Sequence, residues 1–132
     1  MSKKIYIGKS GVPGAGRGVF ASADIKTDEV IENCPILIFD KADDAHLAKT
    51  LLMNYVFDYT GRASMLALGY GSLYNHHINP NAKYELEEYE GAPEYENELC
   101  ITALRPIKKG EEIFINYGPY YDEKYGGVKK KK

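Results

Sequence analysis

Turn-forming residues divide this chain into apolar segments of only three or four residues, and this spacing limits what it can fold into. The clearest segments, each bounded by glycine, proline or aspartate, are Ile5–Ile7, Gly18–Ala21, Val30–Glu32 and Ile36–Phe39. They favour strands, because branched and aromatic side chains pack well on a pleated surface. Helical spacing of apolar residues runs from about Asp43 to Met53, after an Asp-rich start. The sequence therefore predicts a mainly β fold of small sheets with one short helix.

Alternating patterns add a strand and a hairpin. Aromatic residues occupy every second position from Tyr55 to Tyr59, as in a half-buried strand. Apolar and charged residues alternate over 82–87, and Leu99, Ile101 and Ala103 continue the apolar series beyond a Gly-Ala-Pro turn. We therefore expect residues 82–87 and 99–103 to pair as a hairpin.

A short internal repeat relates two distant parts of the chain. Residues 25–29 resemble residues 107–111, and in both places a turn containing Asp or Gly leads into a β-branched strand. The repeat predicts one turn-and-strand unit used twice, in two small sheets. A chance match between two five-residue segments is the alternative.

At 132 residues the chain is long enough for a core but too short for two domains. We expect a single domain over residues 1–125 and a basic, disordered tail over 126–132. The sequence has no run of 18 apolar residues and no apolar signal-peptide core after Met1, which predicts an intracellular protein without a membrane span. Cys34 and Cys100 form no zinc-binding pattern, so we expect reduced thiols and no structural metal.

The net charge of −2 conceals two charged segments. Seven glutamates and no basic residue lie between Glu85 and Glu98, whereas five lysines and no acidic residue lie between Lys124 and Lys132. The acidic segment would attract a basic polypeptide and repel nucleic acid, although a solvated hairpin turn is the simpler interpretation. We expect no nucleic-acid binding by the domain itself, and at most a weak contact through Lys129–Lys132.

Four glycines between Gly11 and Gly18 let backbone groups approach a ligand without an intervening Cβ. A phosphate-binding P-loop requires Lys and a hydroxyl residue after Gly16, where this chain has Arg17 and Gly18. A dinucleotide-binding motif requires a third glycine and a helix, and here a predicted strand follows. Nucleotide phosphate is therefore not the expected ligand, and a flexible turn is the alternative.

A polar loop, Asn75-His76-His77-Ile78-Asn79-Pro80-Asn81, separates two apolar stretches. Asn favours turns and Pro fixes the backbone, so this segment is poor material for a core strand. Its amides and imidazoles suit a small polar ligand, with a solvated surface turn as the alternative.

The segment from Arg105 to Gly118 contains a predicted buried strand, Ile113–Ile115, that leads to Tyr117. Gly118 then allows a sharp change of direction. A tyrosine hydroxyl at such a point can orient or polarise a reacting group. A tyrosine that only caps the strand is the alternative.

Taken together and in order, these three segments resemble the SET-domain lysine methyltransferases. The family's Gly-x-Gly before a Val-Phe-Ala strand matches residues 16–21, its Asn-His loop matches residues 75–81 without a gap, and its Gly-Glu-Glu stretch ending in Tyr-Gly matches residues 110–118. The likeness extends from about Ile5 to Tyr121. It is greatest to the minimal SET proteins of viruses and prokaryotes.

The resemblance implies the SET (β-clip) fold, in which the segment ending at Tyr117 tucks beneath the loop 75–81 as a pseudoknot. It implies S-adenosylmethionine as the cofactor, bound by Gly16, Arg17, Gly18, Asn75, His76 and Tyr121. It also implies Tyr117 and Tyr55 as catalytic residues, and a channel for the substrate lysine lined by Tyr55, Ile115 and Tyr117.

Some positions depart from the family pattern. Ser72-Leu73 and His77-Ile78 replace the usual Arg-Phe and Ser-Cys, so we assign His77 no role. Ile115 lies where relatives often carry Phe or Tyr, and without a tyrosine hydroxyl there we expect more than one methylation. Zinc-binding cysteines are absent after Tyr117, and the candidates to close the channel instead are Tyr120, Tyr121 and Tyr125.

The implied activity is methyl transfer to the side-chain amine of lysine in a basic protein, such as the tail of a histone or another DNA-packaging protein. A catalytically silent SET module that binds basic proteins is one alternative, and an enzyme acting on a ribosomal or metabolic protein is another. We further expect a homodimer, as in small viral SET proteins, and a location in the cytoplasm, the nucleoid or a host nucleus.

Overall fold

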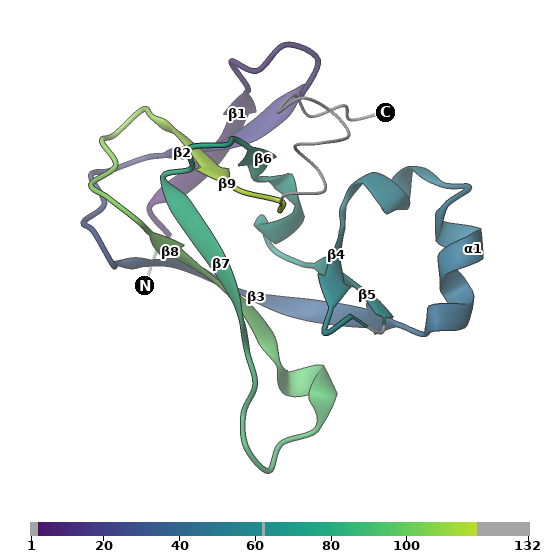
Figure 1. The fold of residues 1–132 in the computed structure, drawn as a ribbon. Coiled ribbons are helices and arrows are strands. Elements are labelled where there is room, and N and C mark those ends of the chain that lie inside the picture. Colours follow the sequence, from purple (N-terminus) through teal and green to yellow (C-terminus); the bar gives the residue numbers. More distant parts are fainter. Residues whose placement is uncertain (1–2, 62, 119–132) are drawn as a thin grey trace.

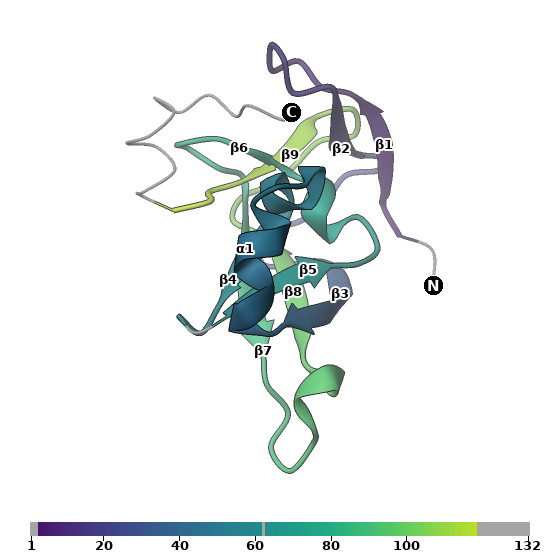
Figure 2. The same cartoon turned by 90° about the vertical axis from the view of Figure 1, so that its right-hand side faces the viewer.

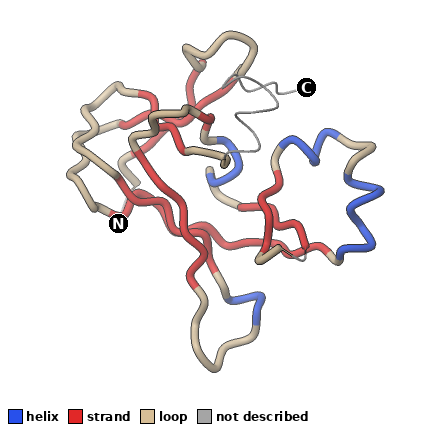
Figure 3. The backbone as a smooth tube through the Cα atoms, viewed as in Figure 1, coloured by secondary structure: helices blue, strands red, loops and turns tan. Residues whose placement is uncertain are grey.

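Residues 3–61 and 63–118 are described by the computed structural model, and their strands form two sheets (Figure 1). The first sheet has the order β1 (Ile5–Lys9), β2 (Arg17–Ala21), β9 (Glu112–Ile115), β6 (Asn75–His76). The second has the order β4 (Val56–Tyr59), β5 (Ala63–Ala67), β3 (Val30–Phe39), β8 (Glu98–Ala103), β7 (Ala82–Glu87). Strands dominate the described chain (Figure 3), which confirms the predicted mainly β fold.

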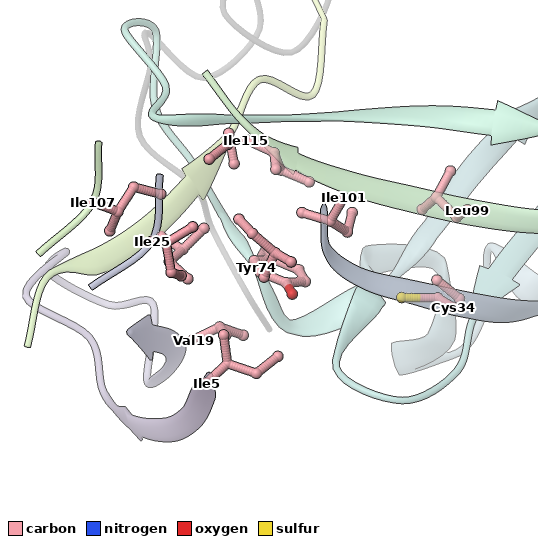
Figure 4. Packing of buried hydrophobic residues seen from close by; sticks show 14 of the residues in the cluster. Ile5, Val19, Ile25, Cys34, Tyr74, Leu99, Ile101, Ile107 and Ile115 are labelled. Carbon is pink, nitrogen blue, oxygen red and sulfur yellow. The ribbon is translucent and has the colours of Figure 1, made fainter. Parts of the chain in front are cut away.

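One apolar cluster joins side chains from both sheets (Figure 4). Ile113 and Ile115 of β9 are buried in it, while Glu112 and Phe114, which alternate with them, are only half-buried. This alternation follows from the pleat of the strand, which directs successive side chains to opposite faces. The ring of Tyr74 is also buried in this cluster.

The predicted hairpin is confirmed, with Leu86 opposite Leu99 and Ala82 opposite Ala103. A short 3-10 helix, Glu94–Glu96, follows its turn. Figure 1 shows the β7–β8 hairpin extending away from the rest of the molecule. We call residues 85–98, which include its seven glutamates, the acidic arm.

The two strands predicted at Val30–Glu32 and Ile36–Phe39 are one continuous strand, β3. Its first part pairs with β8 and its last four residues pair with β5. Pro35, which has no N–H to donate, lies where the strand passes from one partner to the other. Proline therefore marks a change of partner and does not end the strand.

The helix predicted over Asp43–Met53 is shorter than expected. The α-helix α1 covers Asp44–Leu47, with 3-10 helices at Lys41–Asp43 before it and Leu51–Asn54 after it. Thr50 ends the helical run, because its backbone is extended and its hydroxyl donates to the Leu47 carbonyl at 2.9 Å. Figure 2 shows this segment beside β4 and β5.

The internal repeat is real in three dimensions. Ile25 and Ile107 form an antiparallel bridge, and each begins the same turn. The Glu29 carboxylate accepts from the Lys26 N–H at 3.0 Å, and the Glu111 carboxylate accepts from the Lys108 N–H at 2.7 Å. The two turns lead into β3 and β9, which belong to different sheets, as predicted.

Two strands were not predicted. β5 has the sequence Ala-Ser-Met-Leu-Ala, which lacks the β-branched and aromatic residues that signal a strand. Asn75 and His76 form β6, although the polar segment 75–81 was expected to be a loop throughout. That expectation was wrong at these two residues, because they pair in parallel with β9 and are fully buried.

Among the described residues, no helix combines the length and apolar character needed to cross a membrane.

Candidate active site

Segment 75–81 contacts β9 in two ways, by backbone pairing and through the side chain of Asn81. Asn75 lies opposite Phe114 and His76 opposite Ile115 in the parallel pair. The Asn81 side chain makes two hydrogen bonds to the backbone of β9. It donates to the Glu112 carbonyl at 2.9 Å and accepts from the Phe114 N–H at 2.7 Å. These contacts place β9 against the loop as the pseudoknot arrangement requires.

Tyr117 lies immediately beyond this pairing, and two contacts hold it in place. Its backbone N–H donates to His76 Nδ1 at 2.8 Å, and its hydroxyl donates to the carbonyl of Tyr74. The side-chain carbonyl of Asn116 accepts from the Gly118 N–H at 2.7 Å, and Gly118 has a φ of 113°. A residue without a Cβ is thus required where the chain turns away from Tyr117.

Rings from both sheets lie around Tyr117. The Phe57 ring lies edge-on to it, with centroids 6.4 Å apart, and the His76 ring lies at 5.2 Å. Tyr84 packs edge-on against Phe57 at 5.1 Å, and burial raises its pKa. Phe57 was not expected at the site, although it lies in the predicted alternating strand.

Tyr55, the second expected tyrosine, precedes β4 and is half-buried. Its backbone N–H donates to the Leu52 carbonyl at 2.9 Å, which closes the 3-10 turn before the strand. Ile115 is 0% exposed and lies in the apolar cluster of Figure 4. Tyr121, expected at the cofactor, lies outside the described residues, as do Tyr120, Tyr125 and Lys129–Lys132.

The buried carboxylate of Glu32 holds the side chain of Tyr74 in place. Glu32 is 4% exposed and accepts from the Tyr74 hydroxyl at 2.8 Å, from the Tyr70 N–H at 3.0 Å and from Lys3 Nζ at 3.0 Å. Burial, reinforced by the charge of Glu32, holds the pKa of Tyr74 well above its usual value. The Tyr74 hydroxyl therefore stays protonated and acts as a donor.

The glycine segment and Asn75 meet on the other side of β9. Gly16 has a φ of 75°, and a Cβ at Gly18 would collide with the carboxylate of Glu112. The side-chain nitrogen of Asn75 donates to the Arg17 carbonyl and to Glu112 Oε2, both at 2.9 Å. Glu112 was missed in the sequence, because nothing along the chain shows which loop faces the first residue of a strand.

The side-chain carbonyl of Asn75 is buried and has no hydrogen-bond partner among residues 3–61 and 63–118. A buried acceptor without a partner costs free energy, so such an atom points to a missing donor. The structure thus brings together Gly18, Asn75, His76 and Tyr117, which lie in three separate motifs.

His77, to which no role was assigned, points elsewhere. It is exposed, its Nδ1 accepts from the Asn79 N–H at 2.9 Å, and its ring lies 5.2 Å from that of Phe114. The two neighbouring histidines therefore have different environments, and only His76 contacts Tyr117.

Comparison with known proteins agrees with this geometry. The SET domain family model matches residues 16–118. A histone-lysine N-methyltransferase of Schizosaccharomyces pombe, specific for H3 lysine-37, is 35% identical over 80% of this chain and 68% of its own length. The chain belongs to the SET-domain family.

Solved structures show the same fold. A candidate histone methyltransferase from Plasmodium falciparum superposes with a TM-score of 0.73 and 36% identity, covering 90% of this chain and 96% of its own. Polycomb Repressive Complex 2 of Chaetomium thermophilum, bound to S-adenosylmethionine, gives a TM-score of 0.74 at 22% identity, with 94% of this chain and 16% of that chain covered. Other relatives are much longer, since this chain spans 32% of a SETD7 from Halocynthia roretzi, at 23% identity.

Proposed function

We propose that this chain is a protein-lysine N-methyltransferase that uses S-adenosylmethionine and acts on lysine in the basic tail of a histone or another DNA-packaging protein. One observation carries the proposal. A tyrosine, Tyr117, is held by hydroxyl and backbone beside a corner formed by Gly18 and Asn75, where a buried acceptor has no partner within the described part of the chain. The S. pombe relative, which acts on histone H3, supports the substrate class.

The residues present fit the cofactor. A Cβ at Gly16 would meet nothing within 4 Å, so space is left beside the backbone of the glycine segment, and the Asn75 carbonyl is ready to accept from a polar donor. Arg17, His76 and Tyr121 remain proposed cofactor residues with them. When bound, S-adenosylmethionine supplies an electrophilic methyl group on a positively charged sulfur.

The protein must position the substrate lysine and favour the neutral form of its amine. Lysine has an ordinary pKa of about 10.4, and an apolar environment lowers it because burial disfavours the charged form. The rings of Phe57, Tyr84 and Tyr117 form such an environment. The proton passes to water before methyl transfer.

Tyr117 then orients the amine. Its hydroxyl donates to the Tyr74 carbonyl, and this contact fixes the position of the phenol oxygen beside which the amine is proposed to lie. Methyl transfer requires the amine nitrogen to approach the methyl carbon in the correct direction. Alignment of the amine therefore contributes more to this reaction than acid–base catalysis does. Tyr55 is proposed as the second catalytic tyrosine.

The acidic arm is the proposed surface for the basic substrate. Six of its seven glutamates are exposed, and Glu98 is half-buried. Opposite charge over such an arm would raise the encounter rate of a lysine-rich tail. A histone substrate places the enzyme at chromatin.

Titration calorimetry with S-adenosylmethionine, followed by methyl transfer to histones and mixed basic proteins, tests the proposal. We expect cofactor binding by the wild type and by Tyr117→Phe, with transfer at least about 100-fold slower in the variant, because an aligned hydroxyl is lost. Peptide binding without cofactor binding would identify a silent SET module instead. Mass spectrometry of a lysate incubated with labelled cofactor would identify the modified lysines.

A further inference from the structure

Glu112, the first residue of β9, joins three parts of the chain that sequence analysis treated separately. Its carboxylate accepts from the Ser10 hydroxyl at 2.7 Å, from the Gly11 N–H at 3.1 Å and from Asn75 Nδ2 at 2.9 Å. The absence of a Cβ at Gly18 leaves room for this carboxylate. Glu112 thus ties the start of the glycine loop to Asn75, and Asn75 in turn bonds the end of that loop at the Arg17 carbonyl.

These contacts determine which way the Asn75 amide points. Both hydrogens of Nδ2 are used, one by the Arg17 carbonyl and the other by Glu112. Reversing the amide would set the Asn75 oxygen against two acceptors, which is unfavourable. The oxygen is consequently held on the side where none of the described residues gives it a hydrogen-bond donor.

We propose that Glu112 is a positioning residue for cofactor binding, because it orients Asn75 so that a carbonyl, and not an NH₂ group, faces the cofactor. The inference rests on the proposed function, in which this corner binds S-adenosylmethionine. The charge of Glu112 also makes the corner suit a cationic donor, and the amino group of the methionine part is such a donor.

The test compares two ligands in the same variants. S-adenosylhomocysteine carries the amino-acid part, whereas 5′-methylthioadenosine has the adenosine and the thioether without it. Glu112→Met removes all three acceptor contacts and keeps a side chain of similar length. We expect its affinity for S-adenosylhomocysteine to fall at least about tenfold and that for methylthioadenosine to change by less than about twofold.

The ratio of the two dissociation constants separates positioning from stability. Partial unfolding lowers both affinities by the same factor and leaves the ratio unchanged. Glu112→Gln should largely restore the ratio, since its carbonyl can still accept from Asn75 and Ser10 and only the exposed contact with the Gly11 N–H is lost. If Glu112→Met does not fold, Glu112→Ala carries the same comparison.

Glu111→Gln is the matched control. Glu111 caps the neighbouring turn through the Lys108 N–H and does not contact Asn75 or the glycine loop in the described structure, so both affinities should stay within about twofold. An equal loss of both ligands in Glu112→Met, or no loss of either, would overturn the inference. A wild-type protein that binds neither S-adenosylhomocysteine nor S-adenosylmethionine would overturn the proposed function and this inference with it.

Discussion

Single side chains set the geometry at Tyr117. Its hydroxyl meets a backbone carbonyl whose own residue, Tyr74, is tied by its hydroxyl to the buried Glu32. A carboxylate far from the reacting groups thereby determines where a carbonyl lies within the site. Such a series of contacts holds atoms precisely enough for alignment to matter, because both links are hydrogen bonds and the one between Tyr74 and Glu32 is buried.

Ile115 should determine how many methyl groups are added. It lies two residues before Tyr117, and an isoleucine there presents no hydroxyl to hold a methylated amine or a water. We expect wild type to yield di- or trimethyl-lysine, and Ile115→Tyr to stop mainly at monomethyl-lysine. Time-resolved mass spectrometry of a single-lysine peptide measures this. Only monomethyl product from the wild type would contradict the prediction.

Tyr74→Phe should destabilise the fold by about 1–3 kcal/mol, because Glu32 Oε1 would remain buried without its donor. Urea unfolding at pH 7 measures the change. Tyr95→Phe serves as the control, since Tyr95 is 76% exposed and the loss of its hydroxyl should cost less than about 0.5 kcal/mol. Equal costs for the two variants would show that the buried network contributes little.

At the scale of elements, the repeated turn joins the two sheets. Asp28 and Gly110 occupy equivalent positions in its two copies and have φ values of 67° and 92°. Only one copy uses the residue type that tolerates this conformation without strain. The two copies of the turn therefore compare glycine with a residue that has a Cβ at the same position.

Gly110→Ala should destabilise the protein by about 1 kcal/mol, whereas Asp28→Gly should be neutral or slightly stabilising. A Cβ at Gly110 would meet nothing within 4 Å, so the cost reports the backbone alone. Urea denaturation of the two variants gives both values. A stabilising Gly110→Ala would mean that the turn changes conformation in the variant.

The acidic arm offers a second prediction at this scale. Replacing Glu87 and Glu88 by Gln should raise the KM for a basic peptide about two- to tenfold at low salt, because it removes two exposed charges from the proposed substrate surface. The effect should fade near 0.5 M salt. Asp40→Asn with Asp43→Asn removes the same charge elsewhere and should leave KM unchanged. A similar rise in both variants would indicate a general charge effect.

At the scale of the whole molecule, the two sheets share one apolar core. This core also buries titratable side chains and favours their neutral forms. Burial raises the pKa of Cys34 above its ordinary value of 9.0 and that of Tyr74 above 10.0, in each case reinforced by Glu32. Because the unfolded chain would lose these protons at lower pH than the folded protein does, folding and protonation are linked.

Stability should therefore fall as the pH rises above about 9. Below that pH both states keep the protons, and above it the unfolded state binds fewer, so unfolding becomes easier by up to about 1.4 kcal/mol per pH unit for each group. Urea unfolding between pH 8 and 11 measures the slope. Cys34→Ala should flatten it above pH 9 and Tyr74→Phe above pH 10. Unchanged slopes would mean that these groups titrate alike in both states.

The short strands, the hairpin and the repeated turn could be predicted from the sequence, because each depends on neighbouring residues: alternation, turn chemistry and backbone preference. The three motifs, including Tyr117, could be recognised in the sequence for the same reason. The tertiary structure alone decided that Asn75 and His76 form a buried strand, that Pro35 joins two pairings in one strand, and that Glu112 faces Ser10 and Asn75. Those outcomes depend on contacts between residues up to 102 positions apart, and local preference carries no information about which segments will meet.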